Sequence, residues 1–171
     1  MSRMFTRYGR VRWWMHVMIA VTFLLQLLFG FIMSWTSVWS TRRVFLFYHK
    51  SFGLLLFFLA LGFVLQVLCS TRVVPVGVGI MRRMLIELVR VFLLIAVLLM
   101  PLSGWVMSTA SGYIPQLFGW FSVPFPWVGG NPLLGARAHS VHLWLAWAVL
   151  VPLFLHLTGA AFHWWSEKNK R

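Results

Sequence analysis

Four apolar segments, each long enough to cross a lipid bilayer, constrain the fold of this chain more than any other feature of its sequence. They run from Trp13 to Ser34, from Tyr48 to Cys69, from Leu85 to Met107 and from His139 to Trp164. A membrane-spanning helix needs about 20 mostly apolar residues, and each segment meets that length. Continuous apolar runs also exclude a membrane β-barrel, whose strands are roughly 10 residues of alternating polarity. The sequence therefore predicts an all-α integral membrane four-helix bundle, with one domain over residues 1–171.

The composition supports this prediction. Hydrophobic residues make up 61% of the 171 residues and charged residues only 10%, a balance that lies outside the range of soluble domains. A net charge of +13 would suggest nucleic-acid binding in a soluble protein. Here the basic residues flank the apolar segments, as topology determinants of membrane proteins do. We therefore expect the lipid bilayer, and no nucleic acid, as a partner of this chain.

The basic residues also predict the orientation in the membrane. Ten of them precede the first segment, connect the second to the third or follow the fourth: Arg3, Arg7, Arg10, Arg12, Arg72, Arg82, Arg83, Lys168, Lys170 and Arg171. The opposite side has four, which are Arg42, Arg43, Lys50 and Arg137. The positive-inside rule places the richer side in the cytoplasm. Both termini are therefore predicted to be cytoplasmic, and the long connection 108–138 is predicted to lie on the outer face.

The outer connection 108–138 has a high density of glycine and proline, which excludes a further spanning helix. Its aromatic stretch 113–121 suits the headgroup region of a bilayer. Two interpretations stay open at this point. The connection is either a loop that lies on the bilayer surface or a lid over a lipid-soluble substrate such as a quinone.

All six histidines lie within the apolar segments, where an ionisable side chain is costly and usually functional. His142 and His156 are 14 residues apart in the fourth segment. On an α-helix this interval falls about 40° short of four full circles and rises roughly 21 Å, so the two side chains share one face at different depths. The directions of the helices place His49 beside His142 at the outer side and His16 beside His156 at the inner side. The sequence thus predicts two histidine pairs, each contributed by two helices.

Two such pairs at opposite membrane depths are typical of two haem groups, each with two axial imidazoles. Haem iron with both axial positions filled transfers electrons and does not bind oxygen. The chain has no Cys-x-x-Cys-His motif, so we expect haem b that is held without thioether bonds. Zinc is disfavoured because it needs four ligands at one point, often thiolates or carboxylates. A single intramembrane histidine could instead make an interhelical hydrogen bond, but four in matching positions favour haem iron.

The other two histidines and the single cysteine are not predicted to bind haem iron. His139 lies one turn before the outer ligand of the fourth segment, and His163 lies two turns after the inner one. Both are predicted to be interfacial or to contact a haem propionate rather than to bind iron. Cys69 cannot form an intramolecular disulfide and is predicted to be a small packing residue.

The residues around these histidines resemble the bacterial di-haem cytochrome b561 family over nearly the whole chain. The matching stretches are RYGRVRWWMH, YHKSFG, PLSGWVMSTASG and HLWLAWAVLVPLFLHLTGAAFHWW. The resemblance implies a multi-pass protein of the bacterial inner membrane with two haem b groups. It also implies that the axial ligands are His16, His49, His142 and His156, the same four residues that the spacing favours.

One part of the third segment departs from the family pattern. Members of the family usually have a histidine early in the third helix, followed one or two turns later by a tyrosine, whereas this chain has Glu87, Arg90 and Leu94 there. Glu87 and Arg90 are three residues apart on one helix face, so they could form an ion pair. Alternatively, Arg90 could support a propionate of the inner haem, because a guanidinium binds carboxylates with two parallel hydrogen bonds.

The resemblance implies electron transfer between the quinone pool, for example ubiquinone, and a periplasmic donor or acceptor. The resemblance also implies a second possibility, a superoxide:ubiquinone oxidoreductase. The four outer basic residues could steer an anion toward the outer haem in such an enzyme, and ordinary headgroup binding by the same residues is the simpler alternative. A haem-free membrane helper or channel-like bundle is a third possibility, from another functional class. The sequence indicates no catalytic residue.

Overall fold

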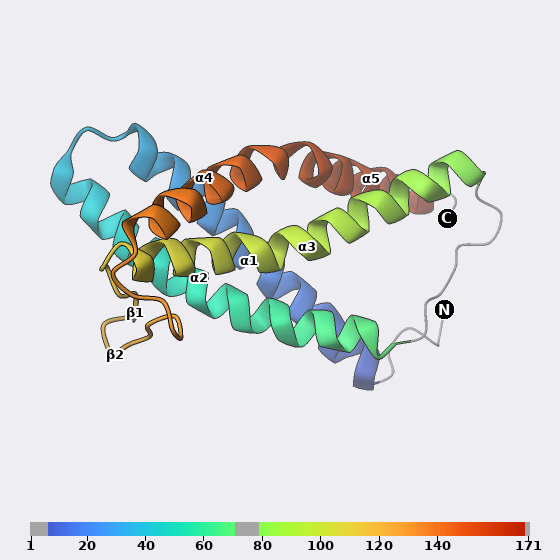
Figure 1. Cartoon of the computed structure of the whole chain (residues 1–171). Coiled ribbons are helices and arrows are strands. Elements are labelled where there is room, and N and C mark those ends of the chain that lie inside the picture. Colours follow the sequence, from blue (N-terminus) through green and yellow to red (C-terminus); the bar gives the residue numbers. More distant parts are fainter. Residues whose placement is uncertain (1–6, 71–78, 170–171) are drawn as a thin grey trace.

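The computed structural model describes residues 7–70 and 79–169, which form mainly long helices (Figure 1). The helices are α1 (Arg7–Trp35), α2 (Trp39–Leu68), α3 (Ile80–Ala110), α4 (Pro132–Ala148) and α5 (Leu150–Lys168). Helices α4 and α5 follow one another and contain one span of 35 residues, Pro132–Ser166. The described part of the chain therefore has four segments that are long and apolar enough to cross a membrane. This confirms the predicted all-α membrane bundle.

The four spans alternate in direction, so the bundle has two distinct ends. Helix α1 begins and α5 ends at one end, which we call the inner end; the α1–α2 connection and the segment 111–131 lie at the other, the outer end (Figure 1). Of the ten basic residues predicted on the cytoplasmic side, Arg3, Arg72, Lys170 and Arg171 lie outside the described residues. The other six lie at or near the inner end. The cytoplasmic assignment of that end stays a prediction.

The helices extend beyond the apolar segments that hydropathy marks. Helix α2 begins nine residues before the predicted start at Tyr48, and α4 begins seven residues before the predicted start at His139. His49 and His142 therefore lie in the third turn of their helices, not at the beginning of the second span or in the first turn of the fourth, as predicted. Hydropathy locates the part of a helix inside the hydrocarbon and misses polar turns that continue into the headgroup region. The outer connection is correspondingly shortened to 111–131.

The fourth span begins with a cap and contains one interruption. The side chain of Asn131 accepts a hydrogen bond from the backbone N–H of Leu134 at 3.0 Å, and Pro132 occupies the first helical position, an arrangement that favours helix initiation. Val149 separates α4 from α5. Pro152 has no N–H to donate to the carbonyl four residues earlier, which accounts for the interruption at this place. The span nevertheless continues, as predicted.

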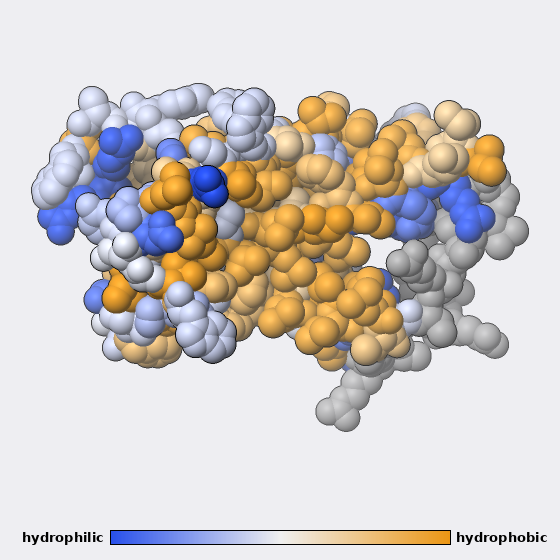
Figure 2. Space-filling model, viewed as in Figure 1, coloured by the Kyte–Doolittle hydropathy of each residue, from blue (hydrophilic) through white to orange (hydrophobic). Residues whose placement is uncertain are grey.

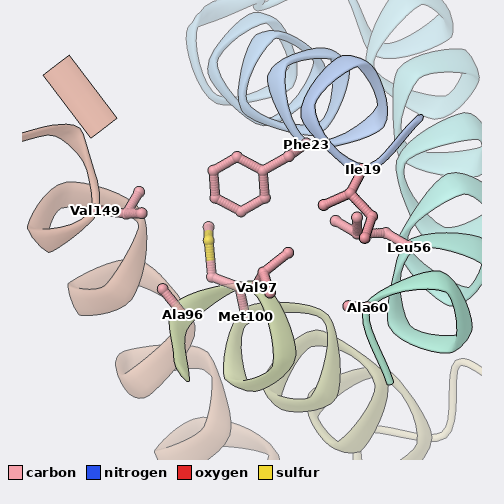
Figure 3. Packing of buried hydrophobic residues seen from close by; sticks show 8 residues of the cluster. All are labelled: Ile19, Phe23, Leu56, Ala60, Ala96, Val97, Met100 and Val149. Atoms are coloured by element: carbon pink, nitrogen blue, oxygen red, sulfur yellow. The ribbon is translucent and has the colours of Figure 1, made fainter. Parts of the chain in front are cut away.

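A cluster of apolar side chains fills the middle of the bundle (Figure 3). Its members come from all four spans and are Ile19, Phe23, Leu56, Ala60, Ala96, Val97, Met100 and Val149. The cluster begins three residues after His16 on α1 and seven residues after His49 on α2, and Val149 lies midway between His142 and His156. Packed apolar side chains therefore separate the outer histidines from the inner ones.

A short β-hairpin covers part of the outer end and was not predicted from the sequence. Strands β1 (Gln116–Leu117) and β2 (Phe121–Ser122) pair antiparallel. The hydroxyl of Ser51, a residue of α2 that is fully buried, donates to the carbonyl of Gln116 at 2.9 Å and accepts from the N–H of Phe118 at 3.1 Å. The hairpin is thus fastened to α2 only two residues from His49.

The surface matches a membrane protein. Figure 2 shows apolar residues over most of the length of the helices and hydrophilic residues toward both ends of the bundle. Many large apolar side chains on the helices are exposed, among them Leu28, Leu65, Leu88 and Phe154. Lipid chains provide the apolar surroundings that such a surface requires.

Candidate functional site

The outer histidine pair joins α2 to α4. The ring centroids of His49 and His142 are 6.1 Å apart, and the ring planes are perpendicular, at 90°. An imidazole nitrogen lies about 2.0–2.1 Å from a bound metal and about 1.1 Å from its own ring centroid, so two imidazoles on opposite sides of one ion have centroids roughly 6.2–6.4 Å apart. The observed separation fits an iron ion between the two rings.

The inner histidine pair joins α1 to α5. The ring centroids of His16 and His156 are 5.9 Å apart, with an angle of 67° between the planes. The ring of Phe63 on α2 lies 5.9 Å from that of His16. His16 is exposed at the surface of the isolated chain, whereas His156, like both outer histidines, is partly buried. The structure therefore brings the four predicted histidines together in the two predicted pairs.

A cavity of about 150 Å³ adjoins the outer pair. Both histidines line it, together with residues of α1, α2, α3 and α4 and with Pro115 of the outer connection. His139 and Lys50 also line the cavity, so one of the two histidines predicted to be interfacial adjoins the site. His163 lies near the end of α5 and belongs to neither pair.

Helix α3 orients the ring of His142. Its Nδ1 atom lies 2.9 Å from the carbonyl oxygen of Met100 and 3.0 Å from the hydroxyl oxygen of Ser103. A carbonyl oxygen only accepts, so Nδ1 carries the hydrogen and donates it. The lone pair of Nε2 is then free for a metal, which is the tautomer that haem ligation requires.

A glycine allows this close approach. A Cβ atom at position 104 would lie 3.2 Å from Cε1 of His142, a separation that few real side chains tolerate. The absence of a side chain at Gly104 therefore lets the imidazole lie against the backbone of α3. Sequence reasoning missed the roles of Ser103 and Gly104, although both lie within the stretch PLSGW, which carries part of the family resemblance.

Helix α3 also contributes charge near the inner pair. Arg90 donates to Glu87 across 3.2 Å, which confirms the ion pair that the sequence left as one alternative. The side chains are 52% and 42% exposed, so water screens this pair and it contributes little to stability. Arg90 lies close enough to His156 to interact with it electrostatically.

The comparison with known proteins assigns the family. A sequence model of prokaryotic cytochrome b561 matches residues 7–171. The chain belongs to the prokaryotic cytochrome b561 family. It is similar to cytochrome b561 homolog 2 of Escherichia coli (strain K12), with 32% identity over 128 residues. That alignment covers 71% of this chain and 64% of the relative, so the match spans less than two thirds of the relative's length.

Family membership gives the class of protein. Members of the prokaryotic cytochrome b561 family are haem-binding membrane proteins, and the four membrane-length helices of this chain agree with a multi-pass bacterial membrane protein of that family. The two histidine pairs fit such a cofactor, because the ring separations of 6.1 Å and 5.9 Å are only slightly shorter than those of two imidazoles on one iron ion, and one ring of the outer pair is already held in the ligating tautomer.

Proposed function

We propose that this b561 cytochrome holds two haem b groups and carries electrons across the bacterial inner membrane. The observation that supports the proposal is the presence of two histidine pairs, with ring centroids 6.1 Å and 5.9 Å apart, in the outer and inner halves of the bundle. His49 and His142 hold the outer haem, and His16 and His156 hold the inner haem. Haem bound in this way supplies a one-electron Fe(III)/Fe(II) couple.

Distance and apolar packing separate the two proposed redox sites from each other and from water. The 14 residues from His142 to His156 correspond to roughly 21 Å along a helix. The apolar cluster at mid-length fills the space between the pairs and excludes water from it. Electrons can therefore pass between the outer and inner sites without an aqueous path for ions or protons.

Quinone and a periplasmic redox partner complete the proposed path. The quinone pool, with ubiquinone as the expected member, exchanges electrons with one end of the two-haem path, and a periplasmic donor or acceptor does so at the other. At the inner site, Arg90 supports a haem propionate, since it lies near His156 and a guanidinium binds carboxylates with two hydrogen bonds. Glu87, its ion-pair partner, lies one turn earlier on the same face of α3.

A second candidate function is superoxide:ubiquinone oxidoreduction. The outer end has four basic residues, which favour an anionic reactant. The two acidic residues of the chain, Glu87 and Glu167, belong to the inner half. Lys50 lines the cavity of the outer pair, whereas Arg42 donates to the carbonyl of Met33 at 2.8 Å. A positive surface of this kind concentrates anions at the site and raises their rate of encounter.

Haem content of the purified protein tests the main proposal. A pyridine haemochrome assay with a quantitative protein determination should give two haem b per chain, and the reduced-minus-oxidised spectrum should have the α band of a b-type cytochrome. One haem per chain would refute the two-site proposal. Superoxide-dependent reduction of a ubiquinone analogue, measured on the same preparation, separates the two candidate functions. A Lys50→Gln variant should slow that reaction, whereas the control Arg82→Gln at the inner end should not.

A further inference from the structure

Helix α3 holds the ring of His142 through two backbone features that are one turn apart. The carbonyl of Met100 accepts a hydrogen bond from Nδ1 of the ring at 2.9 Å, and a Cβ at position 104 would lie 3.2 Å from its Cε1. A side chain in an α-helix points toward the N-terminus and covers the turn that precedes its own residue. Glycine at position 104 therefore leaves the carbonyl of Met100, four residues earlier, open to an imidazole from another helix.

Helix α1 presents the same arrangement to the ring of His49. Gly30 adjoins this ring, because a Cβ there would lie 3.6 Å from Cε1 of His49. The ring faces the backbone carbonyl of Gln26, which again lies four residues before the glycine. The amide nitrogen of Gln26 donates to the carbonyl of His49 at 2.8 Å, so this turn of α1 lies directly against α2. Each outer histidine thus contacts a glycine of a neighbouring helix and faces the carbonyl one turn earlier.

The ring of His49 has a hydrogen-bonding atom that is still unused. Its Nδ1 is buried and completes no hydrogen bond within residues 7–70 and 79–169. A neutral imidazole that gives Nε2 to a metal carries its hydrogen on Nδ1 and needs an acceptor for it. A backbone carbonyl has two lone pairs, so the carbonyl of Gln26 can accept this hydrogen and keep its bond within α1.

We propose that Gly30 is the positioning residue of His49. Because position 30 has no side chain, the imidazole can lie on α1 and donate from Nδ1 to the carbonyl of Gln26 while its Nε2 binds the outer haem iron. Gly104 has the same role for His142. The two glycines together fix the tautomer and the orientation of both outer ligands. The inference rests on the proposed outer haem site.

Contact with the carbonyl sets the electron donation of the ligand as well as its orientation. An acceptor on Nδ1 makes the imidazole a stronger donor to iron, which favours Fe(III) over Fe(II). A side chain at position 30 that pushes the ring off the carbonyl therefore raises the midpoint potential of the outer haem. We expect a change of about tenfold in the Fe(II)/Fe(III) equilibrium, which corresponds to about 59 mV for a one-electron couple.

The test uses the intact protein with its haem groups and three variants. Gly30→Ala places a Cβ 3.6 Å from the ring, which is an ordinary van der Waals separation. Gly30→Val adds γ carbons that extend beyond Cβ and displace the ring. Gly62→Val is the matched control, because position 62 also lies in a span but a Cβ there would meet only the flexible end of Met15. The measurements are the haem content, the two midpoint potentials and the low-spin ferric EPR signal of the outer haem.

Gly30→Val should raise the outer midpoint potential by about 59 mV and shift the outer EPR signal, or lose the outer haem while it keeps the inner one. Gly30→Ala should keep both haems and the EPR signal of the parent, and Gly62→Val should leave both outer properties unchanged. Two bound haems with the parent's outer potential and EPR signal in Gly30→Val would overturn the proposal. Loss of the outer haem from Gly62→Val as well would also overturn it, because general helix packing would then explain both results. If the parent protein itself bound no second haem, the proposed function would fail instead.

Discussion

Replacing Gly104 with alanine tests whether the close packing of α3 on His142 holds the outer haem. The new Cβ would lie 3.2 Å from Cε1 and 3.4 Å from Nδ1 of the imidazole. Non-bonded carbon atoms pack at about 3.5–4.0 Å, so the ring must move by roughly 0.3–0.8 Å. The ring cannot move freely, because its Nδ1 donates a hydrogen bond to the carbonyl of Met100, which lies on α3 like Gly104. The substitution therefore disturbs the ligand and its hydrogen bond together.

The substitution should weaken haem binding rather than the stability of the fold. A ligand must stay within about 0.5 Å of its productive position, and loss of the groups that orient a metal ligand typically lowers affinity about 10- to 100-fold. We expect the Gly104→Ala variant to bind the outer haem about tenfold more weakly, which corresponds to about 1.4 kcal/mol. Alanine within a helix is more stabilising than glycine by roughly 0.5–1 kcal/mol, so the substitution should not destabilise α3 itself.

Haem transfer to excess apomyoglobin measures this effect. The outer haem of Gly104→Ala should dissociate faster than that of the parent, while the inner haem dissociates at the parental rate. Gly62→Ala is the control, because its Cβ would meet only the flexible end of Met15 at 3.5 Å. Equal dissociation rates for Gly104→Ala and the parent would refute the role assigned to this glycine.

Three further predictions follow from the outer hairpin, the inner cation and the ring geometry. Ser51→Ala removes the hydroxyl that fastens the hairpin to α2 and should lower the stability of the folded hairpin by about 1–3 kcal/mol. Amide hydrogen exchange in 116–122 should become faster, and exchange as slow as in the control Ser140→Ala would contradict this prediction. Arg90→Gln removes a positive charge near the inner pair, so the midpoint potential of the inner haem should fall in a redox titration. The control Arg82→Gln should leave that potential unchanged, and an unchanged potential in Arg90→Gln would exclude the propionate contact. The perpendicular rings of the outer pair predict a highly anisotropic low-spin ferric EPR signal, whereas a rhombic signal alone would indicate parallel rings.

The spans and the histidine pairs could be predicted because both depend on simple regularities of the sequence. Apolar length locates a membrane helix, and alternating helix direction assigns each histidine to one side of the membrane. His16 and His156 are 140 residues apart in the sequence, yet topology alone indicates that they meet. The pairing in the structure agrees with that expectation.

The details that depend on tertiary contacts could not be predicted. The hairpin 116–122 is held by the hydroxyl of Ser51, which is 65 residues away from its acceptor in the sequence. The helix ends extend past the hydrocarbon, where hydropathy carries no signal. An amide within a span, such as that of Gln26, is a recognisable signal of function, but only the structure shows that its nitrogen contacts His49.

Haem content of paired histidine variants tests the central proposal most directly. If each haem is held by the pairs proposed here, the double variant His49→Ala/His142→Ala loses only the outer haem and retains one per chain. The double variant His142→Ala/His156→Ala removes one ligand from each site and should retain none with two axial imidazoles. One bis-imidazole haem per chain in this second variant, or two in the first, would contradict the assignment of ligands to sites.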